Sequence, residues 1–108
     1  MGERYCVVLT TCGSREDADR LAGELVNNRL AACIQILPMT SVYLWDGAVQ
    51  QDAECLLLIK TASDRYNDIE AFISEHHPYE VPEIIRVPVD GGLSAYLGWI
   101  DEVTRPGA

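Results

Sequence analysis

The chain has 108 residues, 48% of them hydrophobic, and carries a formal net charge of −9 at pH 7. Its length predicts a single domain over residues 1–108, large enough to bury a core without disulfides or a structural metal. The acidic balance argues against a nucleic-acid partner, because such a surface must replace counterions with Lys and Arg, and no apolar run approaches the roughly 18 residues that would cross a membrane.

The first 30 residues predict a strand followed by a helix. Residues 5–11 are apolar at nearly every position, which is typical of a central strand. The N-terminus lacks the basic start and uninterrupted apolar segment of a signal peptide, so we expect a cytosolic protein. Ser14, with Asp17 three residues later, predicts a capped helix start. The helix then carries an apolar stripe made of Ala18, Leu21, Ala22, Leu25 and Val26.

Residues 31–61 predict one long β-hairpin. Asp46-Gly47 forms its turn, because a type I′ turn needs positive φ at both central residues. Without a bulge, Trp45 then faces Ala48. The first arm would span roughly 45 Å at about 3.3 Å per residue, which exceeds the diameter of about 35 Å expected for a compact chain of this size. Either a bend shortens the hairpin or its tip contacts a partner.

The two arms of the hairpin carry different signals. Pro38 in the first arm indicates an edge strand, because proline has no N–H to donate to a second neighbour. The second arm is apolar on both faces over residues 54–60, which favours a central position in the sheet.

The remaining elements complete the fold prediction. A second helix is expected to start at Ser63 or Asp64, followed by a last strand over residues 83–89 and a third helix over residues 93–103. The tail 105–108 is expected to fray. This order is the ferredoxin-like β-α-β-β-α-β pattern of an α+β protein, an antiparallel sandwich with an extra C-terminal helix and an extended hairpin. In that pattern the first and third strands are central.

The predicted sheet has two apolar faces, but its two crossover helices cover only one of them. The other face would expose more Leu, Val and Tyr than monomers usually do. A copy of the same chain is the simplest cover, so we expect a homo-oligomer.

Several ordered motifs resemble the CutA family of divalent-cation tolerance proteins over residues 7–100. The motifs are Leu30-Ala31-Ala32-Cys33, Ser41-Val42-Tyr43 with Trp45 and Gly47, Glu54 with Leu58-Ile59-Lys60-Thr61, His77-Pro78-Tyr79-Glu80-Val81-Pro82-Glu83-Ile84, and Tyr96-Leu97 with Trp99-Ile100. The resemblance implies a homotrimer, in which three sheets pack face to face and long hairpins reach neighbouring subunits. It also implies a response to metal ions, with copper or another divalent cation bound. Thr10 stands where some members carry a cysteine proposed as a copper ligand, and Cys12 follows two residues later.

His77, Glu80 and Glu83 are the predicted metal ligands, with Cys33 as a fourth candidate. An imidazole and two carboxylates can hold a borderline divalent metal. The alternative is that His77 ends a helix favourably and the two glutamates pair with arginines. Cys33, like the other cysteines, lies at a predicted strand where Cys usually behaves as a small hydrophobe, and the four have no zinc-type spacing.

A cleft between subunits is predicted from aromatic residues and the only lysine. Its expected lining is Lys60, Trp45, Tyr79, Tyr96 and Trp99. The family's architecture is similar to that of the trimeric PII signalling proteins, which bind small effectors in such clefts. Lys60 could instead simply end its strand. Tyr43 and Trp45 are predicted to pack in the trimer interface.

Catalysis finds no support in the motifs. A Gly-rich phosphate loop, a nucleophile elbow and an H-E-x-x-H pattern are all missing from the sequence. We therefore expect a protein that is not an enzyme and needs no organic cofactor, while Cys12 before a helix N-terminus leaves a Cys–His pair open. The expected function is divalent-cation tolerance by a homotrimer. The alternatives are a PII-like effector-binding module and a scaffold for partner proteins.

Overall fold

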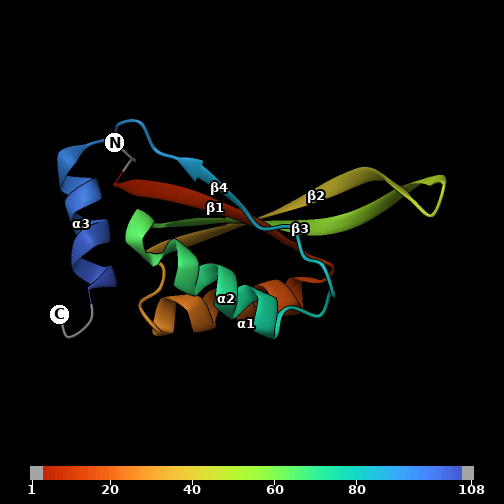
Figure 1. The fold of residues 1–108 in the computed structure, drawn as a ribbon, viewed down its shortest axis with the longest axis horizontal. Helices are drawn as coiled ribbons and strands as arrows, with labels where there is room; N and C mark the ends of the chain where they lie inside the picture. Colours follow the sequence, from red (N-terminus) through yellow and green to blue (C-terminus); the bar gives the residue numbers. More distant parts are fainter. Residues whose placement is uncertain (1–3, 106–108) are drawn as a thin grey trace.

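The computed structural model describes residues 4–105, which form one four-stranded antiparallel sheet and three α-helices (Figure 1). The elements are β1 Tyr5–Cys12, α1 Arg15–Asn27, β2 Cys33–Trp45, β3 Ala48–Ala62, a 3₁₀ turn Ser63–Arg65, α2 Tyr66–His76, β4 Ile85–Pro88 and α3 Ser94–Thr104. The strand order is β2-β3-β1-β4, so β2, which carries Pro38, is an edge strand. The predicted ferredoxin-like α+β architecture is confirmed, with its extra helix and its long hairpin.

Helix α1 begins where the sequence predicts. Ser14 has an extended backbone, and its Oγ accepts a hydrogen bond from the Asp17 N–H at 3.1 Å. This bond satisfies one of the N–H groups that a helix start leaves free. The apolar stripe is buried at Ala18, Leu21, Ala22 and Leu25. The stripe therefore sets which side of α1 packs on the sheet.

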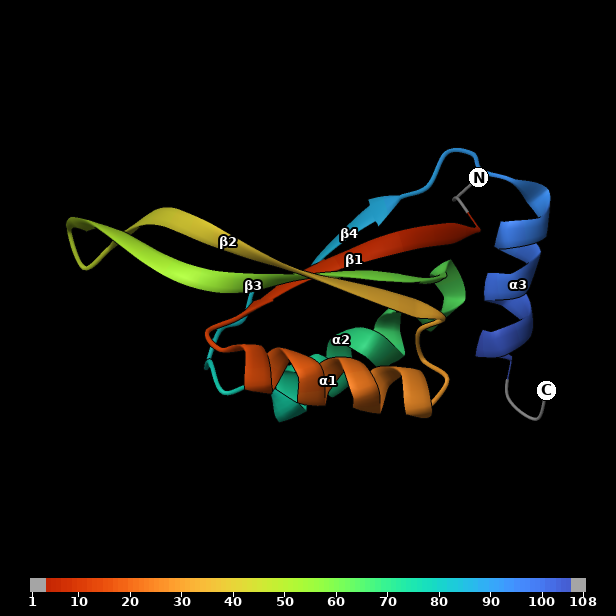
Figure 2. The same cartoon turned by 180° about the vertical axis from the view of Figure 1, so that it is seen from behind.

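The β2–β3 hairpin has the predicted register without a bulge. Trp45 is opposite Ala48, and the pairing continues without a gap to the base of β2. Asp46 and Gly47 have φ angles of 53° and 79°, the positive values that a type I′ turn requires. The described residues span 45 × 26 × 21 Å. The hairpin supplies the long dimension, because its outer half projects beyond both α1 and α2 (Figures 1 and 2).

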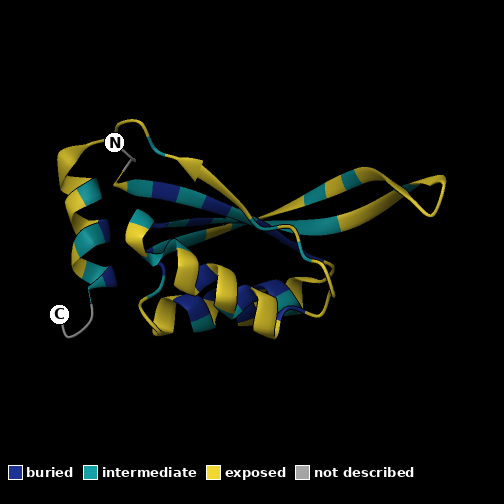
Figure 3. Ribbon diagram, viewed as in Figure 1, coloured by how far each residue is buried: buried dark blue, intermediate teal, exposed yellow. Residues whose placement is uncertain are grey.

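The sheet has a covered face and an open face. Directly paired residues share a face, and neighbours along a strand alternate between faces. The covered face lies against α1 and α2 and is almost completely buried (Figure 3). It comprises Cys6, Val8, Thr10, Cys12, Leu57 and Ile59. The open face carries Val7, Leu9, Leu37, Leu56, Leu58, Ile85 and Val87.

The open face keeps much of its apolar surface in contact with solvent. Leu37, Ile85 and Val87 are 43%, 49% and 41% exposed in the single chain. The outer half of the hairpin is exposed as well, and Trp45 at its tip is 69% exposed. The apolar surface for which the sequence predicts a second copy is therefore present.

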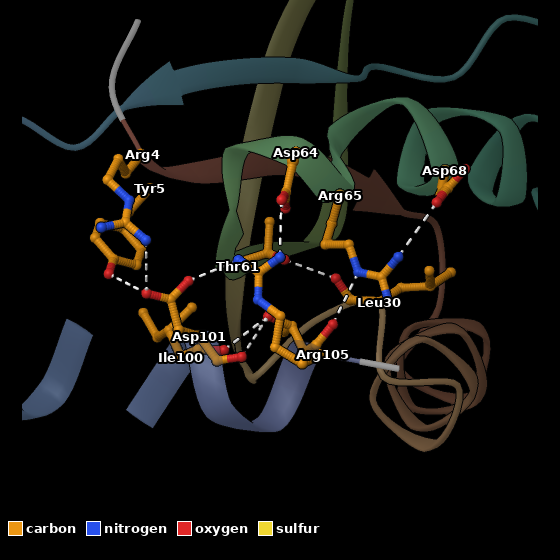
Figure 4. A network of polar contacts seen from close by, with 11 residues as sticks. Arg4, Tyr5, Leu30, Thr61, Asp64, Arg65, Asp68, Ile100, Asp101 and Arg105 are labelled. Atoms are coloured by element: carbon orange, nitrogen blue, oxygen red, sulfur yellow. Dashed lines mark hydrogen bonds and ion pairs between the residues drawn. The ribbon is translucent and has the colours of Figure 1, made fainter. Parts of the chain in front are cut away.

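Helix α3 crosses the end of the sheet that lies away from the hairpin tip, and polar contacts fix it there (Figures 1 and 4). The Tyr5 hydroxyl donates to Asp101 Oδ2 at 2.5 Å. Arg105 forms ion pairs of 2.8 Å with both Asp101 and Asp64. These four residues, which we call the α3 network, tie the last helix to β1 and to the turn before α2.

Two predicted element boundaries are wrong. The α-helix α2 begins at Tyr66 rather than at Ser63 or Asp64, because residues 63–65 form a tighter 3₁₀ turn that lacks a side-chain cap. Strand β4 covers only Ile85–Pro88, shorter than the predicted 83–89, because the β1 ladder runs beside it from Cys6 to Leu9 and ends with one further bond, from the Val89 N–H to the Tyr5 oxygen at 3.0 Å.

The expected fraying of the C-terminal tail is wrong for Arg105, which the α3 network holds. The rest of that tail, residues 106–108, lies outside the described residues. Within residues 4–105, no helix is long and apolar enough to cross a membrane.

Candidate functional site

A cleft of about 940 Å³ lies between the hairpin and the connector that follows α2. Its lining is Thr11, Ser41, Val42, Tyr43, Trp45, Glu54, Tyr79, Glu80, Val81 and Glu83. The hairpin supplies aromatic rings and Glu54, while the connector supplies two further carboxylates. We call this site the carboxylate cleft.

Tyr79 is held at the floor of the carboxylate cleft. Its hydroxyl donates to Glu54 Oε2 at 3.0 Å. Partial burial and this hydrogen bond raise the pKa of Tyr79 to about 12, so the hydroxyl stays a donor at neutral pH. Gly13 makes room for the ring, since a Cβ at this position would lie 2.9 Å from the Tyr79 hydroxyl. The connector is thereby fixed to β3 through one side chain.

His77 is buried beside the carboxylate cleft, and both of its ring nitrogens are engaged. Nδ1 accepts a hydrogen bond from the Tyr79 N–H at 3.0 Å. Nε2 lies 2.6 Å from the backbone oxygen of Thr11. An accepting Nδ1 carries no proton, so Nε2 must be the donor to Thr11. His77 therefore joins the end of β1 to the connector, and a metal would have to displace one of these bonds.

The four predicted metal ligands are not brought together within one chain. Glu80 and Glu83 line the carboxylate cleft, and His77 lies beside it. Cys33 lies at the base of β2, opposite Lys60. Among residues 4–105, no group of three or more His, Cys, Asp and Glu side chains is arranged to hold a metal ion. The predicted four-residue set stays a prediction.

The predicted inter-subunit cleft divides into two separate groups in one chain. Trp45 and Tyr79 line the carboxylate cleft, together with Tyr43. Lys60 Nζ instead lies 5.8 Å from the centre of the Tyr96 ring, at the end of the sheet that α3 crosses. From Ala48, the partner of Trp45, to Lys60 the β3 strand extends for about 40 Å.

The Lys60 group also includes Trp99, whose ring centre lies 5.7 Å from that of Tyr96. Both rings belong to α3 and remain partly exposed. Because of the length of β3, the five predicted residues can share one cleft only if different copies of the chain contribute them. This assembly stays a prediction.

Sequence reasoning did not select Glu54 as a site residue. Its partner Tyr79 comes from an irregular connector, whose path no periodicity predicts. The register alone does place Glu54 on the open face, one step beyond Leu56 in the same alternation. This alternation of faces along β3 was the sequence pattern from which Glu54 could have been selected.

The chain matches the family model described as CutA1 divalent ion tolerance protein over residues 6–103. "Protein CutA 1, chloroplastic" of Oryza sativa subsp. japonica is 43% identical over 100 residues, which make up 92% of this chain and 56% of the rice protein. "Divalent-cation tolerance protein CutA" of Thermus thermophilus is 44% identical over 99 residues, with 91% and 96% of the two chains covered. The crystal structure of CutA1 from Oryza sativa superposes with a TM-score of 0.93 at 40% identity and covers 98% of both chains.

The extent of these matches differs among the relatives. The chain spans a little over half the length of the rice, Arabidopsis thaliana and mouse relatives, namely 56%, 55% and 54%. The matched region contains the carboxylate cleft and all of the sheet and helices except Tyr5, the first residue of β1, and Thr104, the last residue of α3. The family description refers to tolerance of divalent ions and names no reaction.

Proposed function

Because this chain belongs to the CutA1 divalent ion tolerance family, we propose that it acts in divalent-cation tolerance as a homotrimer that binds copper or another divalent cation. The family match over residues 6–103 carries this proposal. The cation-binding part is supported by the carboxylate cleft, and the trimer by the open face.

The carboxylate cleft supplies oxygen ligands in an acidic protein. Glu54, Glu80 and Glu83 come from two different segments and line one space. Carboxylate oxygens bind many divalent cations, and the net charge of −9 raises the local concentration of cations. Of the predicted metal ligands, Glu80 and Glu83 can bind a cation without breaking the hydrogen bonds of His77.

The open face supports assembly from copies of the same chain. Its apolar residues would lose contact with water only if a partner covered them, at about 25 cal/mol for each Å² of buried apolar surface. Both edge strands, β2 and β4, also have an unpaired side that another strand can join. The number three comes from the family resemblance.

Calorimetric titration tests the cation-binding part. Cu²⁺ and Zn²⁺ are titrated into the wild type, a Glu80→Gln/Glu83→Gln variant and a Glu75→Gln variant, which removes a carboxylate from the exposed side of α2. We expect the first variant to bind at least about tenfold more weakly, a loss of about 1.4 kcal/mol, and the control to bind like the wild type. Identical isotherms for all three proteins would overturn the site.

His77→Ala is a less selective variant, because it also removes the contacts to Thr11 and Tyr79.

Size-exclusion chromatography with light scattering tests the assembly separately. The expected mass is about three times the 12.0 kDa of one chain. A monomer at all concentrations would contradict the trimer without affecting the titration result.

A second candidate is a PII-like module that binds a small anionic effector. The observation that favours it is the position of Lys60, the only lysine, beside Tyr96 at the end of the open face. A thermal-shift screen of nucleotides and simple anions, run on the wild type and on Lys60→Gln, distinguishes the two functions. Stabilisation that requires Lys60 would favour the effector module, whereas a response to cations alone would favour the first proposal.

A further inference from the structure

Two of the four cysteines lie directly opposite each other in the sheet. Cys12 ends β1, and its partner across the β1–β3 ladder is Cys55. Both lie on the covered face, in line with the Thr10–Leu57 pair. Cys12 is fully buried, while Cys55 is partly exposed. Cys6 lies six residues before Cys12 on β1, opposite Thr61. Cys33 lies on β2, opposite Lys60.

The ladder geometry sets the Cα and Cβ separations of the two cysteines. The Ser63 N–H donates to the Arg4 oxygen at 2.8 Å, and hydrogen-bonded pairs recur at every second position of an antiparallel ladder. Arg4 and Ser63 are thus a hydrogen-bonded pair, and every second residue of β1 from Arg4 onward belongs to such a pair. Cys12 is one of these residues, so Cys12 and Cys55 form a hydrogen-bonded pair. In such pairs the Cα atoms are about 5.5 Å apart, and the Cβ atoms lie near the upper end of about 4.5–5.5 Å.

This spacing leaves room for a bridging metal ion. The Cα separation of about 5.5 Å also lies within the disulfide range, but a disulfide prefers Cβ atoms about 3.5–4.5 Å apart, closer than the Cβ atoms of such a pair. Two metal–sulfur bonds of about 2.3 Å in a line instead hold the sulfur atoms about 4.6 Å apart. The Cβ separation of the pair is therefore compatible with an ion between the thiols.

The neighbouring groups restrict the ion to two protein ligands. His77 Nε2 is 3.9 Å from the Cys12 sulfur, but it is engaged with the Thr11 oxygen. Burial raises the pKa of Cys12 to about 11, and Asp17 and Cys55 add to the effect. Free Cys12 therefore stays a thiol at neutral pH and is a weak nucleophile. A soft ion that binds thiolate strongly can still displace the proton.

We propose that Cys12 and Cys55 form a two-thiolate site for a soft, closed-shell cation of the Cu(I) type. Thiolates select such ions, whereas Zn²⁺ at a structural site requires four ligands and finds two here. The ion enters from the partly exposed Cys55, and two thiol protons leave to solvent as two metal–sulfur bonds form. Cys12 and Cys55 lie back to back with Thr11 and Glu54, which line the carboxylate cleft from the open face. Thr11 and Glu54 therefore lie on the face of the sheet opposite the two thiols.

The test uses Ag⁺, a redox-inert ion with the same closed shell, and then Cu(I) held by a competing chelator under anaerobic conditions. Native mass spectrometry of the fully reduced protein gives the number of ions per chain. We expect one ion in the wild type and in the matched control Cys6→Ala, in which a buried thiol on the same covered face of β1 is removed. Excess Zn²⁺ should not displace the ion.

Cys55→Ser should weaken binding by roughly a hundredfold or more, since even an outer-shell partner is worth about 10–100-fold in metal affinity. Cys12→Ala should do the same, and circular dichroism checks that each variant is folded. Equal affinity in Cys55→Ser and the wild type would overturn the site, as would equal losses in Cys6→Ala and Cys55→Ser. Rapid formation of a Cys12–Cys55 disulfide with hydrogen peroxide, seen as the loss of two hydrogens in the intact mass, would overturn the spacing argument.

Discussion

The two faces of the sheet are built from the same kinds of residue and meet different surroundings. On the covered face Val8, Leu57 and Ile59 are fully buried by α1 and α2. On the open face Leu37 and Ile85 stay about half exposed, although they are equally apolar. One chain thus carries more apolar surface than its own core can bury. The comparison teaches that the folding of a single chain does not account for the apolar residues of the open face.

Leucine truncations on the two faces give the largest expected effect. Leu57→Ala should lower the free energy of unfolding by about 2–5 kcal/mol, because it opens a cavity in a packed core. Leu37→Ala removes the same atoms from a half-exposed site and should cost less than half as much in a single chain. Urea denaturation measures both. An equal cost would indicate that a second copy buries Leu37, and a cost below about 1 kcal/mol for Leu57→Ala would contradict the assignment of the core.

Truncation at the hairpin tip tests whether copies meet on the open face. Burying a large apolar side chain is worth about 1.5–3 kcal/mol, so Trp45→Ala should weaken association of the copies by about tenfold or more. Light scattering over a dilution series measures the shift. Val26→Ala on α1 is the control, because its side chain is exposed on the helical side of the molecule. If both variants associate like the wild type, the tip does not contribute to assembly.

Two buried threonines on the covered face differ in their hydrogen bonding. Both Thr10 and Thr61 are fully buried, and Thr61 donates to the Leu30 oxygen at 2.7 Å. Within residues 4–105, the Thr10 hydroxyl finds no hydrogen-bond partner. Thr10→Val should therefore raise the free energy of unfolding by about 1 kcal/mol, whereas Thr61→Val should lower it by about 1–3 kcal/mol. Changes of the same sign in both variants would indicate that Thr10 has a partner such as a buried water.

Much of the fold follows from local signals in the sequence. Asp46-Gly47 predicts the turn and with it the register of the whole hairpin, because side chains alternate with a strict period of two. Pro38 predicts the edge position of β2. The start of α2 and the short β4 were not predictable in the same way. They depend on a weakly capped turn and on how far β1 extends beside β4.

The candidate site was less accessible to prediction than the fold. Glu80 and Glu83, which were selected as metal ligands, both line the carboxylate cleft. The roles of His77 and Tyr79 depend on contacts with Thr11 and Glu54. These contacts join an irregular connector to strands that are distant in sequence, so no period reveals them. The separation of Lys60 from Trp45 follows from the length of β3 and could have been counted from the register.

The α3 network gives the smallest expected effect and concerns the end of the sheet that α3 crosses. The hydrogen bond from Tyr5, followed by that from Arg105, lowers the pKa of Asp101 below its ordinary value. A carboxyl whose pKa is lower in the folded than in the unfolded state stabilises the fold above the unfolded pKa of about 3.9. This contribution is lost as the pH falls through the lowered value. Because Asp101 is partly exposed, it amounts to about 1 kcal/mol or less.

Asp101→Asn should therefore lower the free energy of unfolding near pH 7 by up to about 1 kcal/mol, and the difference from the wild type should shrink as the pH falls below about 4. Urea denaturation at several pH values measures this convergence. Asp68→Asn is the matched control, because the Asp68 carboxylate is exposed, lies 3.5 Å from Arg65 and should change stability by about 0.5 kcal/mol or less. A deficit in Asp101→Asn that persists in acid would mean that Asp101 acts through packing rather than charge. The hold of α3 on the sheet would then be the same at every pH.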